Sequence, residues 1–208
     1  MKIALKLFLL VVIVGLGYMV VESIMEPVRF NKEKDKREAS VIHKLEDIRA
    51  GELAFRKMNG VYTASWDTLI DFLKTNEFFI VKEVADPNDT TYSKTIRDTL
   101  GTIKVMDSLY NERPNFQLDK QKYVDQLKYV PIPQKDFANE TFELRASKIE
   151  RGGVPVQVFE SQVGYEVMLK GLDNQLILNL IKKVEEMNKY PGLKVGSLTE
   201  ASTEGNWK

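Results

Sequence analysis

An uncharged apolar run close to the start of the chain limits what it can fold into more than any other feature. The 15 residues from Leu7 to Val21 carry no charge, and as a helix they measure roughly 22 Å. The hydrocarbon layer of a bilayer is roughly 30 Å thick, and the apolar neighbours Leu5, Ile24 and Met25 extend the run toward that length. The segment therefore predicts a single membrane-spanning helix.

Basic residues at the short end of this segment predict its orientation. Lys2 and Lys6 precede the apolar run, and basic flanks stay on the cytoplasmic side of a membrane. The remaining chain is then expected outside a bacterial inner membrane, in the periplasm. A cleaved signal peptide is the alternative, because Gly15 and Gly17 are small residues near a possible cleavage point. We favour the anchor, since the chain stays apolar to Val21 and no A-x-A stretch follows.

The part of the chain after the apolar run is long enough for one folded domain. About 180 of the 208 residues follow it. The hydrophobic fraction is 43% and the aromatic fraction 10%, as expected of a folded chain. Lys and Arg together number 30 and so do Asp and Glu, and this neutral total argues against nucleic acid as a partner. The absence of cysteine excludes disulfides, thiolate catalysis and a lipoprotein anchor.

A long amphipathic helix is predicted to follow the membrane segment. Residues 31–40 are mostly charged and of mixed sign, which is typical of a solvated spacer at the membrane surface. Apolar residues then recur at helical spacing and Asn59-Gly60 supplies a stop, so the helix should cover residues 34–58. It can continue the membrane helix with a break at Pro27.

The clearest strand signals lie in the last third of the chain. Phe142–Ile149 and Val154–Phe159 are rich in apolar and β-branched residues. Gly152 and Gly153 between them can adopt the positive φ of a hairpin turn. The other predicted elements are a helix Trp66–Lys74 capped by Ser65 and ended by Asn76, a strand Phe78–Val81, weaker strands Thr102–Leu109 and Tyr123–Ile132, a short strand from Gln175 that gives way to a helix near Lys182, and a last strand Leu193–Leu198.

These elements predict an α+β fold. An N-terminal transmembrane helix leads into a long amphipathic helix packed on an antiparallel β-sheet, with a helix and a strand at the C-terminal end. The predicted parts are an anchor (1–26), a charged membrane-proximal spacer or helix start (27–40), a periplasmic domain (41–198) and a flexible polar tail (199–208).

Residues with catalytic or metal-binding chemistry are sparse. His43 is the single histidine, and no Walker loop, Rossmann fingerprint or G-x-S-x-G turn is present. We therefore expect neither an enzyme nor a bound cofactor. The candidate metal ligands are Asp86, Asn88 and Asp89, whose hard oxygens could hold calcium, although the EF-hand pattern is missing.

One passage carries a family resemblance. From Ile48 the chain reads Ile-Arg-Ala-Gly-Glu-Leu-Ala-Phe-Arg-Lys-Met-Asn-Gly-Val-Tyr-Thr. It resembles the point in type IV pilins and type II secretion pseudopilins where the long helix ends in Asn-Gly-x-Tyr before a Ser and a short helix, here Ser65–Leu69. The resemblance covers roughly residues 40–75. It implies a pilin-like fold, with the long helix packed on the sheet, and a place in a secretion or pilus assembly.

The start of the chain departs from the pilin pattern. A prepilin has a Gly before its cleavage site and a Glu a few residues into the apolar run, whereas the first acidic residue here is Glu22, at the far end of the run. The resemblance therefore implies a pilin-like protein that stays anchored, rather than a filament subunit. The assembly-platform proteins of the same machines, with a tether, a short coiled coil and a ferredoxin-like domain, are the alternative resemblance.

Four short motifs resemble the sequon at which some Gram-negative bacteria O-glycosylate exported proteins, an Asp followed by Ser or Thr and a small or aliphatic residue. The acceptors would be Thr68, Thr90, Thr99 and Ser108. Three of them crowd into residues 86–110, a stretch rich in loop signals. The alternative is that such Asp-Thr pairs serve at helix caps and turns.

The leading functional hypothesis is a membrane-anchored structural or assembly component of a bacterial envelope complex. Its expected partners are the lipid bilayer and other envelope proteins, in a homo- or hetero-oligomer. The alternative is a periplasmic binding or lipid-carrier module tethered to the inner membrane, which would need an apolar cavity among the strands between Phe142 and Val167.

Overall fold

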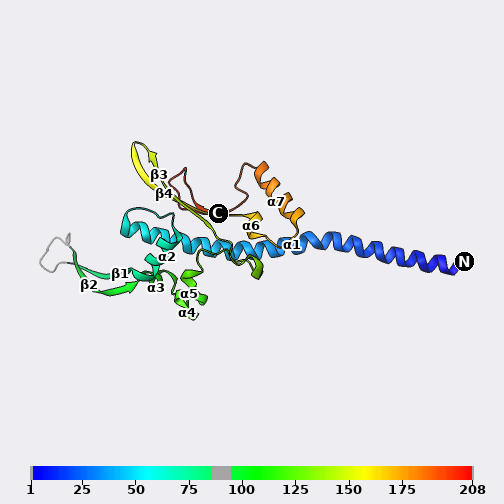
Figure 1. Ribbon diagram of the computed structural model, residues 1–208, viewed down its shortest axis with the longest axis horizontal. Coiled ribbons are helices and arrows are strands. Elements are labelled where there is room, and N and C mark those ends of the chain that lie inside the picture. The colour runs from blue at the N-terminus through cyan, green and yellow to red at the C-terminus, as the bar shows by residue number, and fades with distance from the viewer. Residues whose placement is uncertain (1, 86–94, 208) are drawn as a thin grey trace.

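A single long helix forms the axis of the molecule. The structure is a computed structural model that describes residues 2–85 and 95–207. Helix α1 runs unbroken from Lys2 to Asn59, and everything else is folded around its second half (Figure 1). It continues through Pro27, where we expected a break. A bidentate ion pair between Glu22 and Arg29 spans this proline, at 2.9 and 3.2 Å.

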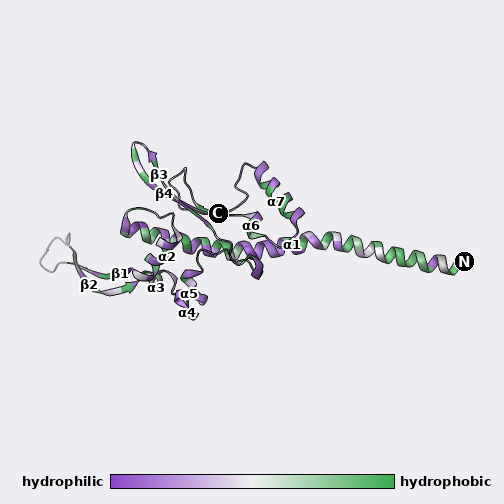
Figure 2. Ribbon diagram, viewed as in Figure 1, coloured by the Kyte–Doolittle hydropathy of each residue, from purple (hydrophilic) through white to green (hydrophobic). Residues whose placement is uncertain are grey.

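The first half of α1 is apolar and bare. Its side chains from Leu7 to Val21 are exposed in the folded chain, and the hydropathy colouring shows this half as mostly green (Figure 2). In the described part of the chain, this is the one helix that is long and apolar enough to cross a membrane.

The second half of α1 supplies one wall of the core. Val41, Leu45 and Ile48 are completely buried, and their spacing places them on one face of the helix. Strands β4 (Val154–Gly164) and β5 (Gly192–Gly196) pack against α1. The predicted α+β fold, with a long N-terminal helix on an antiparallel sheet, is therefore confirmed.

Two separate antiparallel sheets flank this helix. The larger has the order β3-β4-β5, where β3 is Glu143–Arg151. Its first hairpin turns at Gly152 and Gly153 with φ of +61° and +78°, as the sequence predicted. The second sheet is a two-stranded arm, β1 (Glu77–Ala85) and β2 (Thr95–Lys104), which projects beyond the far end of α1 (Figure 1).

Short helices connect the sheets. Ser65 caps α2 by accepting a hydrogen bond from the Thr68 backbone N–H, and Asn76 ends this helix, both as predicted. The helices are α2 (Trp66–Thr75), α3 (Val105–Tyr110), α4 (Pro114–Leu118), α5 (Lys120–Asp125), the 3-10 helix η1 (Lys135–Phe137), α6 (Tyr165–Met168) and α7 (Asn174–Glu186).

Three strand predictions are wrong in whole or in part. The segment Thr102–Leu109 is the end of β2 followed by α3, and Tyr123–Ile132 begins inside α5. Residues 175–181 are helical throughout, because Asp173 accepts a hydrogen bond from the Leu176 N–H at 2.8 Å and starts α7 at Asn174, about two turns earlier than we expected. In this last segment Leu176, Leu178 and Leu180 alternate as in a strand, whereas Ile177, Ile181 and Val184 are spaced as in a helix.

The charged stretch and the tail are both more ordered than the sequence suggested. Phe30 is only 8% exposed and Arg37 is buried, so packing of the domain begins inside the expected spacer. At the other end, Gly205 forms a β-bridge with Val195, and the Asn206 side-chain amide donates to the Gly192 carbonyl at 2.9 Å. The last residues therefore lie against β5 instead of hanging loose.

Candidate functional site

Charged side chains of α1 are buried along its core-facing side, and each joins the helix to a different element. Arg37, Asp47 and Glu52 are all less than 4% exposed, and Lys44 is half-buried between them. A buried charge is costly unless it is paired. The partners of these four residues therefore show how the domain is held on its helix.

Arg37 fixes the part of the domain nearest the apolar half of α1. Its guanidinium donates hydrogen bonds to the carbonyls of Met168 and Lys170, at 3.2 and 2.9 Å, and to Glu33 at 3.1 Å. Met168 is the last residue of α6 and Lys170 lies two residues further on, and a cation is favourable at the C-terminal end of a helix. This contact ties α6 to α1 close to Phe30.

Lys44 holds the end of α5. Its ammonium donates to the backbone carbonyls of Gln126 and Tyr129, the latter at 2.9 Å. Burial lowers the pKa of Lys44 to about 8, although the charge of Asp47 opposes that shift.

Asp47 is the centre of the densest polar network. Its carboxylate accepts hydrogen bonds from Arg113 Nε at 2.8 Å and from the Tyr123 hydroxyl at 2.5 Å, and Arg113 Nη2 forms an ion pair with it at 2.7 Å. Its backbone carbonyl accepts a bond from the Tyr110 hydroxyl at 2.9 Å. Burial raises the pKa of Asp47 and of both tyrosines, while the bonds from Arg113 and Tyr123 oppose the rise at Asp47. The rings of Tyr110 and Tyr123 pack with Phe116, so this network clamps α3, α4 and α5 onto α1.

Glu52 is completely buried and only half satisfied. One carboxylate oxygen accepts a hydrogen bond from the Thr63 backbone N–H at 3.1 Å, whereas the other has no partner in the described chain. Burial raises the pKa of Glu52 to about 8, so the carboxyl is largely protonated at neutral pH. The contact holds the turn between α1 and α2.

An open cleft of about 460 Å³ lies beside this row of charges. It is lined from α1 by Ser40, His43, Lys44 and Asp47, and from the facing elements by Arg113 and Tyr123 among others. Asp47, Arg113, Tyr123 and Lys44 already bind one another or backbone carbonyls, and His43 lies 3.7 Å from Glu46. These contacts tie α1 to the facing elements across the cleft.

A second hollow borders the turn between β3 and β4. Ile149, Glu150 and Arg151 line one side and Thr199–Ser202 the other. Its lining is mostly polar and it is open to solvent. A lipid would need an apolar, enclosed lining, which this hollow does not provide.

The β1–β2 arm carries apolar side chains that its own hairpin leaves uncovered. Phe79 on β1 is 71% exposed and Leu100 on β2 is 63% exposed. Ile80 and Val81, which follow Phe79 on β1, are exposed as well. A β-bulge between Ile80 and Val81 interrupts the register opposite Leu100. The arm is thus an apolar projection at the end of the molecule opposite the bare half of α1 (Figure 1).

The residues singled out in the sequence are scattered over the surface. His43, Thr68, Thr99 and Ser108 are exposed, on α1, α2, β2 and α3 respectively. Thr90 and the calcium candidates Asp86, Asn88 and Asp89 lie outside the described residues. Among residues 2–85 and 95–207 there is no group of three or more His, Asp or Glu that could hold a metal ion.

Sequence reasoning did not single out the buried charges. A signal for two of them exists, because Arg37 and Glu52 continue the stripe of Val41, Leu45 and Ile48 at steps of three or four residues. A charge on an apolar stripe indicates a buried partner. The partners themselves come from segments far along the chain, and no local pattern predicts them.

Comparisons of the chain with protein-family models, with curated proteins and with solved structures gave no match.

Proposed function

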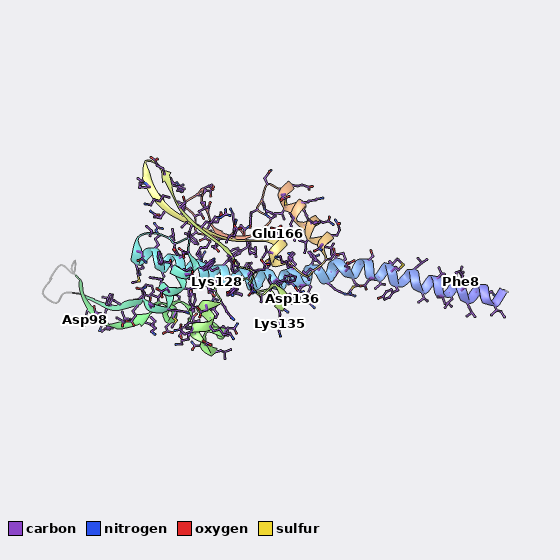
Figure 3. The ribbon with its side chains drawn as sticks, in the orientation of Figure 1. Phe8, Asp98, Lys128, Lys135, Asp136 and Glu166 are labelled. Carbon is purple, nitrogen blue, oxygen red and sulfur yellow. The ribbon has the colours of Figure 1, made fainter. Side chains whose placement is uncertain are left out.

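We propose that this chain is a membrane-anchored structural or assembly component of a bacterial envelope complex that acts through protein–protein contacts. The observation that carries the proposal is the separation of two uncovered apolar surfaces. Phe8 lies on the bare end of α1 and Asp98 lies at the far end of the molecule, on the arm (Figure 3). One surface suits lipid and the other suits protein.

The bare half of α1 supports the anchor. Residues 7–21 expose apolar side chains over their whole length. Exposure to water costs about 25 cal/mol for each Å² of apolar surface, so this segment needs a bilayer or another apolar partner. Lys2 and Lys6 at its short end support a cytoplasmic N-terminus, with the folded part in the periplasm.

The arm supports the protein contacts. An isolated two-stranded ribbon is only marginally stable in water, and exposed apolar residues on a ribbon with free edges favour association with another chain. Phe79 and Leu100 are the most exposed of these residues. A partner that covers them would stabilise the arm and bury both side chains.

The arrangement of α1 supports the pilin-like part of the proposal. A long helix that is apolar in its first half and packs on an antiparallel sheet in its second half is the arrangement that the resemblance of residues 40–75 implies. Without the prepilin cleavage pattern, the chain stays in the membrane as part of a pilin- or pseudopilin-like complex.

The test is cross-linking in the membranes of the source cell. A photo-reactive amino acid replaces Phe79, and a matched variant carries it at Leu118, which is 85% exposed on α4 away from the arm. We expect Phe79 to give a discrete cross-linked band and Leu118 to give none. The partner is then identified by mass spectrometry.

Two results would overturn the proposal. One is a Phe79 variant that forms no cross-link although the protein is folded and membrane-bound, because the arm would then make no protein contact. The other is a full-length chain released by carbonate washing of the membranes, which removes the anchor.

A further inference from the structure

The two sheets of the described chain have four strand edges. In the larger sheet the edge strands are β3 and β5, and in the arm they are β1 and β2. An edge strand presents unpaired backbone N–H and C=O groups, which can pair with an extended segment of another chain. Proteins protect such edges with charged side chains, with bulges or with a covering segment. An edge that lacks all three devices is open to an incoming strand.

Both edges of the larger sheet are protected. The covering segment of β5 is the C-terminal tail, because the Gly196 N–H donates to the Glu204 carbonyl at 3.0 Å. Lys194 exchanges hydrogen bonds with Asn206 in the same way, at 3.0 and 3.1 Å. On β3, five of the nine positions carry a charge, namely Glu143, Arg145, Lys148, Glu150 and Arg151.

The edge of β2 is interrupted by the bulge of the arm. Ile80 pairs with Gly101 and Val81 pairs with Thr99, so Leu100 is the extra residue and lies on β2. A bulge bends its strand and breaks the regular spacing of the hydrogen-bonding groups. A regular strand therefore cannot run along β2 past Leu100.

The edge of β1 has none of these devices. The strand is nine residues long and regular, its centre Phe78–Val81 is uncharged, and within the described residues it pairs with β2 alone. Phe79 and Ile80 point to opposite faces of the arm, and both are exposed. A partner on one face would leave the other face bare. A strand alongside β1 places side chains on both faces, so the exposure pattern favours docking at the edge.

The charges at the two ends of the apolar run indicate what this strand carries. Glu77 and Lys82 flank the run and are both exposed. On β2, Lys104 lies opposite Glu77 and Asp98 lies opposite Lys82. Opposite charges on neighbouring strands stabilise a sheet. A strand on the free side of β1 gains in the same way from a basic residue beside Glu77 and an acidic residue beside Lys82.

A second copy of the chain does not fit this edge. The arm continues roughly in the direction of α1 (Figure 1). Two identical edges related by a two-fold axis pair antiparallel, so such a dimer reverses the direction of α1 in the partner. The two apolar halves of α1 would then point in opposite directions and could not enter the same bilayer. The occupant is therefore a segment of a different protein.

We propose that β1 is a strand acceptor, whose free edge pairs with an extended segment of another envelope protein. That segment carries an apolar run as long as Phe78–Val81, with a basic residue beside Glu77 and an acidic residue beside Lys82. This inference rests on the proposed function and adds the mode of contact and the chemistry of the partner. The added strand makes the arm three-stranded, and a sheet needs about three strands to be stable in water.

The test is a scan of the arm with a photo-reactive amino acid in the full-length chain, in membranes of the source cell. It is placed singly at Phe79, Ile80 and Val81 on β1 and at Thr99 and Thr102 on β2, and the linked partner residue is mapped by mass spectrometry. Thr102 and Thr99 lie opposite Phe79 and Val81, so these four share one face. A strand added beside β1 lies two strand spacings, about 10 Å, from β2.

We expect all three β1 positions to cross-link to one stretch of a single protein, with the linked residue moving one position along that stretch at each step. The two β2 positions should give several-fold weaker bands. Cross-links at Phe79, Val81, Thr99 and Thr102 but not at Ile80 would show that the partner covers one face. The inference is then wrong, while the protein contact of the arm stands.

A second copy of the chain as the linked protein would overturn the inference in the same way. If no position cross-links although the protein is folded and membrane-bound, the proposed function fails and the inference fails with it.

Discussion

At the scale of single residues, the buried charges of α1 decide how the domain is held. Arg37, Lys44, Asp47 and Glu52 each bind groups from a different part of the chain, so α1 acts as a row of specific attachment points. An apolar stripe alone would allow the surrounding elements to slide along the helix. Buried polar contacts restrict the packing to one register, because displacement leaves a charge without a partner.

Glu52 predicts a pH dependence of stability. Burial raises its pKa from 4.5 to about 8, so the folded chain holds a proton that the unfolded chain releases. Its contribution to stability is complete below pH 4.5 and is lost as the pH rises to 8. The Glu52→Gln variant should remove this loss, which amounts to at most about 5 kcal/mol.

The measurement is denaturant unfolding of both chains between pH 5 and pH 9. The gain of the variant over the natural chain should grow with pH and level off above pH 8. The exposed Glu150→Gln change on β3 is the control and should show no such trend. Parallel curves for the natural chain and Glu52→Gln would show that Glu52 is not protonated in the folded state.

The Asp47 network predicts a large effect from a partly exposed residue. Arg113→Ala removes a hydrogen bond and an ion-pair contact from the buried Asp47 carboxylate, and loss of one partner of a buried pair costs roughly 3–5 kcal/mol. Arg145→Ala removes an ion pair with Glu143 that is more than half exposed, and should cost less than about 1 kcal/mol. Equal losses of unfolding free energy in the two variants would contradict the role given to Asp47.

At the scale of elements, the arm and the core differ in what they contribute. Phe79→Ser together with Leu100→Ser should change the unfolding free energy by roughly 0.5 kcal/mol or less, because both side chains are exposed. The same double variant should lose most of the partner that copurifies with the natural chain. A large fall in the melting temperature would show instead that the arm is part of the core.

The elements also show how far the sequence alone could lead. Local residues determine the two ends of α2, at Ser65 and Asn76, and the turn at Gly152-Gly153. The structure has all three where the sequence predicted them. Local chemistry does not determine the conformation of segments 102–109 and 123–132. Their short apolar runs suit a strand or a helix, and packing against the rest of the fold decides between the two. The candidate site was harder still to predict from the sequence, since Arg113 and Tyr123 are both more than 60 residues away from Asp47 along the chain.

At the scale of the whole molecule, the folded domain begins earlier than the sequence suggested. A chain that starts at Val28 keeps Phe30 and Arg37 and should fold as a soluble protein. A chain that starts at Glu38 loses one buried aromatic residue and the bonds from Arg37 to α6. It should be less stable by at least about 3 kcal/mol, as measured by denaturant unfolding. Similar stabilities would mean that residues 28–37 are a spacer after all.

The unbroken helix α1 couples the angle of the membrane segment to the position of the far tip of the protein. Because α1 passes through Pro27 as one rod, a change of angle in the bilayer moves the whole protein as a lever. The part beyond Glu26 is about 50 Å long, so a tilt of roughly 20°, common for membrane helices, sweeps its far tip sideways by about 17 Å. A thinner bilayer increases the tilt of a fixed-length helix, so the position of the tip depends on the thickness of the membrane.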